Sequence, residues 1–118
     1  MEENIIKDKS QNFAQKIVEL SQKIIAEQNE SVLSKQLLSS GKLIVALFRE
    51  VGHGQSRAYF ASKMNIAMKK TNETDYCLSL LKDSGYISPE WYESVSKDAK
   101  ELVNLMANSV ETNNLENS

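Results

Sequence analysis

The chain has 118 residues, a length that fits one domain able to bury a hydrophobic core without disulfides or metal. Its single cysteine and single histidine exclude an internal disulfide and leave too few ligands for a zinc site of the usual type. The net charge of −2 is uneven: residues 1–70 hold eleven Lys and Arg against seven Asp and Glu, whereas residues 71–118 hold three against nine. With four glycines and one proline, helix breakers are few and long helices are expected.

The first helix is predicted from about Ser10 to Gln28, after a polar N-terminal segment that we expect to be frayed. Its apolar residues recur at the spacing of one helix face: Phe13, Ile17, Leu20 and Ile24. The next three residues, Asn29-Glu30-Ser31, are typical of a short polar turn. We expect Ser31 to cap the following helix.

The second helix is predicted from about Val32 to Val51, and the segment 43–48 within it is apolar on every side. A buried strand is excluded because helical spacing continues on both sides and no second strand exists to pair with it. A bundle helix buries a stripe of roughly 100°, so part of this ring would face water in a monomer. We therefore predict a subunit contact here, the alternative being that this helix is simply the most buried one of a monomer. The candidate interface residues are Leu43, Val45, Leu47 and Phe48.

A break at Gly52-His53-Gly54 separates the second helix from a third, predicted from about Arg57 to Ser84 with Ser56 as its cap. The core-facing positions of this third helix alternate in steps of four and three: Phe60, Met64, Ala67, Thr71, Thr74, Leu78 and Leu81. Gly85 is expected to end the helix.

The fourth helix should begin at Ser88-Pro89-Glu90, where a capping serine precedes a proline suited to the first helical position. Its apolar positions again follow helical steps: Trp91, Val95, Ala99, Leu102, Met106 and Val110. The residues from Thr112 onward are polar and expected to be disordered. Residues 1–118 therefore predict one all-α domain, an antiparallel up-down-up-down four-helix bundle ordered over about 8–111.

No motif indicates catalysis, a metal or a cofactor. His53 lacks an orienting carboxylate and a nucleophile, and Cys77 borders the helical seam, where a small buried residue is the simplest reading. Glu50 and Glu73 could form an acid pair only if they met across two helices; a structural role for them is favoured. The acidic N-terminus lacks the layout of a signal peptide, and no apolar run reaches the roughly 20 residues of a membrane span. We expect a cytoplasmic protein that is not an enzyme.

Basic residues recur every seven positions and form stripes along the predicted helices. Such stripes are commonly solvated faces, and the alternative is a surface that binds RNA or DNA. The candidate nucleic-acid-binding residues are Lys35, Lys42, Arg49, Arg57, Lys63 and Lys70. The small number of arginines and the acidic C-terminal part of the chain weigh against the alternative.

Several segments stand in a specific order and spacing along the chain: Ser34 to Gly41, Arg49-Glu50, Gln55 to Met64, Ala67 to Tyr76, and Leu81 to Ile87. Together, over about residues 5–110, they resemble the bacterial four-helix bundle proteins encoded by intervening sequences of 23S rRNA genes. The resemblance implies a bundle assembled as a ring-shaped homopentamer, with no established enzymatic activity. It also implies kinship with the accessory variability protein of diversity-generating retroelements, which binds nucleic acid and a reverse transcriptase.

The chain departs from the family pattern in the apolar segment of the second helix. Relatives usually carry a small residue at position 45 and an asparagine at position 47, where this chain has Val45 and Leu47. The acidic pI of about 5.5 also differs from the basic retroelement relative. Both departures weaken the transfer of nucleic-acid binding. The sequence thus predicts an oligomeric scaffold or interaction module, with a nucleic-acid-binding accessory protein as the alternative.

Overall fold

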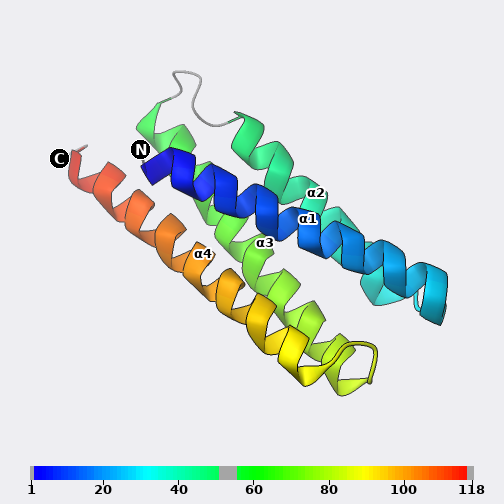
Figure 1. The fold of residues 1–118 in the computed structure, drawn as a ribbon. Helices are drawn as coiled ribbons and strands as arrows, with labels where there is room; N and C mark the ends of the chain where they lie inside the picture. Colours follow the sequence, from blue (N-terminus) through cyan, green and yellow to red (C-terminus); the bar gives the residue numbers. More distant parts are fainter. Residues whose placement is uncertain (1, 51–55, 117–118) are drawn as a thin grey trace.

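The structure, a computed structural model, describes residues 2–50 and 56–116, and these residues form four helices without any strand (Figure 1). The helices are α1 (Glu2–Gln28), α2 (Val32–Glu50), α3 (Arg57–Asp83) and α4 (Pro89–Glu116). Each helix packs on two neighbours: α1 on α2 and α4, and α3 on α2 and α4. Because neither diagonal pair comes into backbone contact over the described residues, the helices stand at the corners of an antiparallel bundle measuring 50 × 22 × 19 Å. The predicted all-α four-helix fold is confirmed.

The core follows the predicted heptad spacing most closely in α3 and α4. In α3, the positions from Met64 to Leu81 named above are all buried, and Phe60 is half-buried at the end of the row. Thr71 and Thr74 enter this core without leaving an unpaired hydroxyl, because each donates a 2.8 Å hydrogen bond to a carbonyl of its own helix. The small residues in the middle of α3 are therefore packing positions of the bundle.

The first and last helices extend further toward the two chain termini than the sequence suggests, both at the same end of the bundle (Figure 1). The helix α1 begins at Glu2, and Ile6, expected in a frayed segment, is fully buried. Ile6 lies one heptad before Phe13, so it extends the same apolar stripe and anchors the first turns of α1 to the core. The helix α4 likewise continues to Glu116, past Thr112, where a disordered tail was expected.

The turn between α1 and α2 corrects the predicted cap. Asn29 has a positive φ of 59°, a conformation that asparagine tolerates well. The Glu30 carboxylate, and not the Ser31 hydroxyl, accepts the free N–H groups of α2: those of Val32 and Leu33 at 3.1 Å and that of Ser34 at 3.0 Å. Partial burial of this carboxylate raises its pKa, but the hydrogen bonds outweigh burial, and the pKa of Glu30 is lowered from 4.5.

The starts of α3 and α4 and the end of α3 have the capping residues predicted from the sequence. The hydroxyls of Ser56 and Ser88 each accept a 3.1 Å hydrogen bond from a backbone N–H of the first turn of α3 or α4. Gly85 has a φ of 84°, and its N–H donates to the Lys82 carbonyl while that of Tyr86 donates to Leu81. This pair of bonds is a Schellman motif, which ends α3 and turns the chain toward α4. The predicted break at Gly52-His53-Gly54 lies outside the described residues.

Candidate interaction surfaces

A mostly apolar groove of about 550 Å³ runs along the outside of the bundle between α1 and α2. Its lining includes Ala14 and Val18 from α1 and Gly41, Val45 and Ala46 from α2. These side chains are small or β-branched, so the groove is hollowed where two helices lie close together. Its charged lining residues are Glu19 on α1 and Lys42 on α2. We call this surface the α1/α2 groove.

The structure divides the predicted interface residues between this groove and the core. Val45 is half-buried and lines the groove, while Leu43 is half-buried and packs against the core. Leu47, expected between subunits, is only 5% exposed and belongs to the core of the protomer. The reason is register: α2 turns positions 44 and 47 inward together, so the apolar ring serves the core on one side and the groove on the other. The side chain of Phe48 lies outside the described residues.

The predicted basic residues whose side chains are described lie on more than one surface. Lys42 lies in the α1/α2 groove, whereas Lys70 lies in a different, broader groove between α2 and α3. Lys70 forms an ion pair with Glu73 at 3.2 Å, and the Lys63 ammonium lies 5.2 Å from the centre of the Tyr59 ring. The side chains of Arg49 and Arg57 lie outside the described residues.

Two of the predicted lysines keep free charges. Lys35 and Lys42 are exposed on α2, one heptad apart, and neither has an ion pair among the residues that the structure describes. Among the predicted basic residues whose side chains the structure describes, Lys35 and Lys42 are therefore available to an anionic partner.

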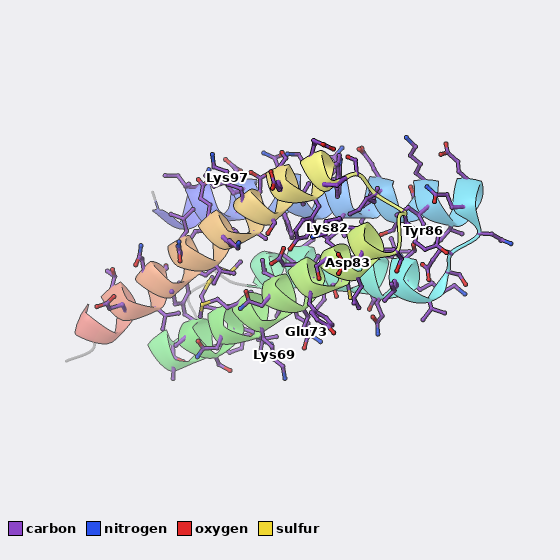
Figure 2. The ribbon with its side chains drawn as sticks, turned by 90° about the horizontal axis from the view of Figure 1, so that it is seen from below. Lys69, Glu73, Lys82, Asp83, Tyr86 and Lys97 are labelled. Carbon is purple, nitrogen blue, oxygen red and sulfur yellow. The ribbon has the colours of Figure 1, made fainter. Side chains whose placement is uncertain are left out.

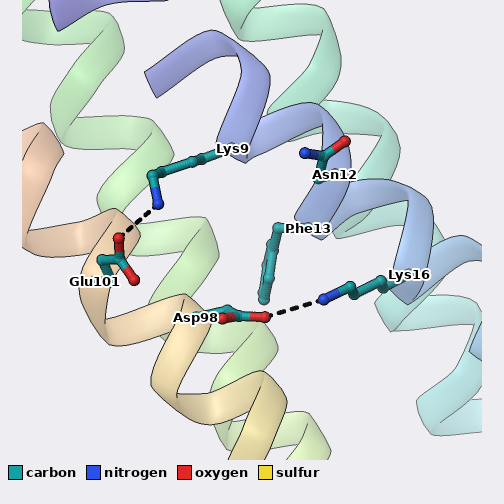
Figure 3. Close-up of a pocket in the computed structure, with 6 residues that line it drawn as sticks. All are labelled: Lys9, Asn12, Phe13, Lys16, Asp98 and Glu101. Atoms are coloured by element: carbon teal, nitrogen blue, oxygen red, sulfur yellow. Dashed lines mark hydrogen bonds and ion pairs between the residues drawn. The ribbon is translucent and has the colours of Figure 1, made fainter. Parts of the chain in front are cut away.

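The α1 lysines connect α1 to α4. Lys9 pairs with Glu101 at 2.6 Å and Lys16 pairs with Asp98 at 3.2 Å, on either side of a small cavity of about 170 Å³ against Phe13 (Figure 3). All four charged side chains are about half exposed, so each pair adds little to stability. Sequence reasoning missed these pairs because their partners lie more than 80 positions apart and carry no shared motif.

The surface formed by α2 and α3 carries an exposed tyrosine and the lone cysteine. Tyr76 is 65% exposed, and Lys69 and Glu73 lie near it on the outer face of α3 (Figure 2). The Cys77 thiol lies 3.4 Å from the side-chain oxygen of Gln36, to which it donates. Burial raises the pKa of the Cys77 thiol and the charge of Glu73 raises it further, so the thiol is protonated at neutral pH and a weak nucleophile.

Among the described residues, the titratable and nucleophilic side chains form no cluster that resembles a catalytic or metal-binding site. No group of three His, Cys, Asp or Glu side chains there could hold a metal ion. The side chain of Glu50, which the alternative acid pair with Glu73 would need, lies outside the described residues, as does His53. None of the helices described has a stretch long and apolar enough to cross a membrane.

Fold and surface together define a helical-bundle protein whose features are grooves and charged faces. Residues 2–108 match the family model described as 23S rRNA-intervening sequence protein, so the chain belongs to that family. A solved structure from Bacteroides thetaiotaomicron, of a protein with unknown function from the S23 ribosomal protein family, is 46% identical. The similarity covers 94% of this chain and 99% of that chain, with a TM-score of 0.88. None of the curated proteins matches the chain.

Proposed function

We propose that the chain is a self-assembling helical module that holds partners together without catalysing a reaction. The observation that carries this proposal is the α1/α2 groove, because the bundle hides its core completely yet leaves Val18, Val45 and Ala46 around a hollow facing outward. Burying apolar surface between two subunits removes it from water, which favours association by about 25 cal/mol per Å² of apolar surface buried.

The resemblance of the sequence to ring-forming relatives supports a ring-shaped homopentamer as the assembled form. In such a ring every subunit repeats the same contact, so one groove per subunit is enough to build the whole assembly. The core of the described residues is buried within one protomer and three helix starts are capped, so we expect the bundle to fold as a single subunit. Assembly therefore joins folded subunits, and disrupting the contact should leave the protomer intact.

Static light scattering after size-exclusion chromatography tests the proposal. We expect a mass several times that of the 13.3 kDa protomer at concentrations from about 1 to 100 µM, a range over which specific interfaces are occupied. A strict monomer over the whole range would refute self-assembly.

A second candidate function is binding of RNA or DNA, alone or together with a nucleic-acid-processing protein. The specific observation in its favour is the free charge of Lys35 and Lys42, which lie one heptad apart on exposed α2 positions. In a ring these two lysines would repeat in every subunit and so multiply a weak attraction for phosphates. The ion pairs of Lys9, Lys16 and Lys70 oppose this function by neutralising the other stripes.

Fluorescence anisotropy with a labelled single-stranded RNA and a labelled DNA duplex separates the two functions. Binding that falls steeply with salt, and that is lost when Lys35→Glu and Lys42→Glu are combined in a variant that keeps the wild-type mass, would support nucleic-acid recognition. The matched control is Lys97→Glu with Lys100→Glu, two exposed positions on α4. Absence of binding at low salt, with the assembly intact, would leave the scaffold function alone.

A further inference from the structure

We propose that the subunit contact joins two different faces: the α1/α2 groove of one copy receives the outer face of α3 from the next copy. The inference rests on the proposed self-assembly and specifies its geometry. The receiving surface is the groove defined above. The inserting surface, which we call the α3 ridge, consists of Ile66, Lys69, Glu73 and Tyr76.

The α3 ridge is a continuous outward row on one helix. Its four residues follow in steps of three, four and three, which places them on one face, and all four are exposed. Ile66 is 39% exposed and Tyr76 is 65% exposed, and both are among the few large apolar side chains that the described surface leaves in water. Figure 2 shows Lys69 and Glu73 pointing away from the bundle on this side of α3. The ridge thus combines protruding apolar side chains with charges of both signs.

Shape argues against a groove that pairs with itself. Two copies related by a twofold axis through the groove would set hollow against hollow. The apolar lining is alanine, valine and glycine, too short to fill the space between them, and the longer lining side chains are all polar: Gln11, Gln15, Glu19 and Lys42. Unfilled apolar space forfeits the packing contacts that make an interface stable. The occupant must protrude, and Ile66 and Tyr76 supply large exposed side chains on α3, where Tyr76 stands at the edge of the α2/α3 groove.

The charged residues of the groove and of the α3 ridge are complementary in sign. The groove carries Glu19 on its α1 side and Lys42 on its α2 side, and Lys42 has no ion pair among the described residues. The ridge carries Lys69 and Glu73 one helical turn apart, so each charge of the groove has a counterpart of opposite sign. The existing Lys70–Glu73 ion pair lies at the surface, with side chains 33% and 46% exposed, and is weak enough to rearrange.

A contact between two different faces has a consequence for the assembly. Each copy offers one groove and one ridge, so every added subunit leaves one of each free, until the ring closes. A variant with a blocked groove still has its ridge, and a variant with a blocked ridge still has its groove. Mixing the two should restore one contact and no more.

Mixing of two charge variants tests this directly. Ala46→Glu blocks the groove and Ile66→Glu blocks the ridge, and both positions are exposed, so neither change threatens the protomer. The two introduced charges have the same sign and cannot rescue each other. We expect each variant alone to be monomeric and an equimolar mixture to form a heterodimer of about twice the 13.3 kDa protomer mass. Circular dichroism checks that both variants are folded, and Asn104→Glu on the outer face of α4 should keep the wild-type mass.

The results distinguish a failure of the groove-to-ridge contact from a failure of self-assembly. A monomeric wild type would refute self-assembly itself. If the wild type assembles and Ala46→Glu abolishes assembly while Ile66→Glu leaves it unchanged, the groove is the contact but the α3 ridge is not its occupant. If both variants are folded monomers and their mixture also stays monomeric, the pairing of the two faces is refuted.

Discussion

Gly41 of α2 lies so close to Ala14 of α1 that a Cβ at position 41 would sit 3.4 Å from the Ala14 carbonyl oxygen. It would lie equally close to Cγ2 of Val18, and both distances are ordinary van der Waals contacts. The close approach of α1 and α2 therefore tolerates one methyl group but no more. It sets the depth of the α1/α2 groove.

This spacing predicts opposite effects for two substitutions at position 41. Gly41→Ala should raise the free energy of unfolding by about 0.5–1 kcal/mol, because alanine favours a helix interior and the methyl group fits. Gly41→Leu should lower it by about 1–3 kcal/mol, because the larger side chain meets Val18 and Ile17. Urea denaturation in the Ala46→Glu background measures both effects without a contribution from assembly. Destabilisation by both substitutions would show that the helices are closer than described.

The Glu30 cap predicts a pH-dependent contribution to stability. Since the pKa of Glu30 is lowered in the folded state, the unfolded chain binds the proton more readily, and acid favours unfolding. The stabilisation is complete above the ordinary value of 4.5 and is lost as pH falls through the lower folded-state pKa. Glu30→Gln should therefore cost about 1 kcal/mol near neutral pH and progressively less as the solution becomes acidic.

Thermal or urea unfolding of the wild type and Glu30→Gln between neutral and acidic pH measures this difference. Glu27→Gln serves as the control, because Glu27 is exposed and lies one turn earlier, before the helix end. A gap between wild type and Glu30→Gln that stays constant, or widens in acid, would contradict the role of the carboxylate.

Replacing Gly85 at the end of α3 should lower the free energy of unfolding through backbone conformation alone. Its φ of 84° suits glycine, and no atom lies within 4 Å of a Cβ built there, so a side chain meets no steric obstacle. Gly85→Ala should cost about 1–2 kcal/mol from the left-handed backbone alone, and Gly85→Asn should cost less. Equal stability of wild type and Gly85→Ala in urea would mean that the Schellman turn is not maintained.

The periodicity of the sequence predicted the helices and their cores, since positions such as Leu78 and Leu102 repeat at a spacing that only a helix face satisfies. It missed the start of α1, because Ile5 and Ile6 are the only apolar residues between Glu2 and Ser10, too few to show a helical period, although Ile6 is fully buried in the bundle. It also assigned Leu47 to a subunit contact. In an all-apolar segment the periodicity disappears, and only the position of the neighbouring helices decides which side chains face inward.

Surface features were less predictable than the core. The heptad spacing of lysines was read from the sequence, but their partners were not, because Lys9 and Glu101 meet only through the packing of the first helix on the last. The α1/α2 groove could not be foreseen either. Its lining comes from two helices, and each contributes residues such as Ala14 and Ala46 that carry no signal on their own.

Sedimentation equilibrium of the wild-type protein, in 0.1 M and in 1 M NaCl and beside Ala46→Glu, tests most directly whether the α1/α2 groove drives assembly. An apolar contact is not weakened by salt, so we expect the wild type to remain a multimer in both solutions and Ala46→Glu to sediment as a folded 13.3 kDa monomer. A wild type that is monomeric at 0.1 M NaCl, or an Ala46→Glu variant that keeps the wild-type mass, would contradict the account.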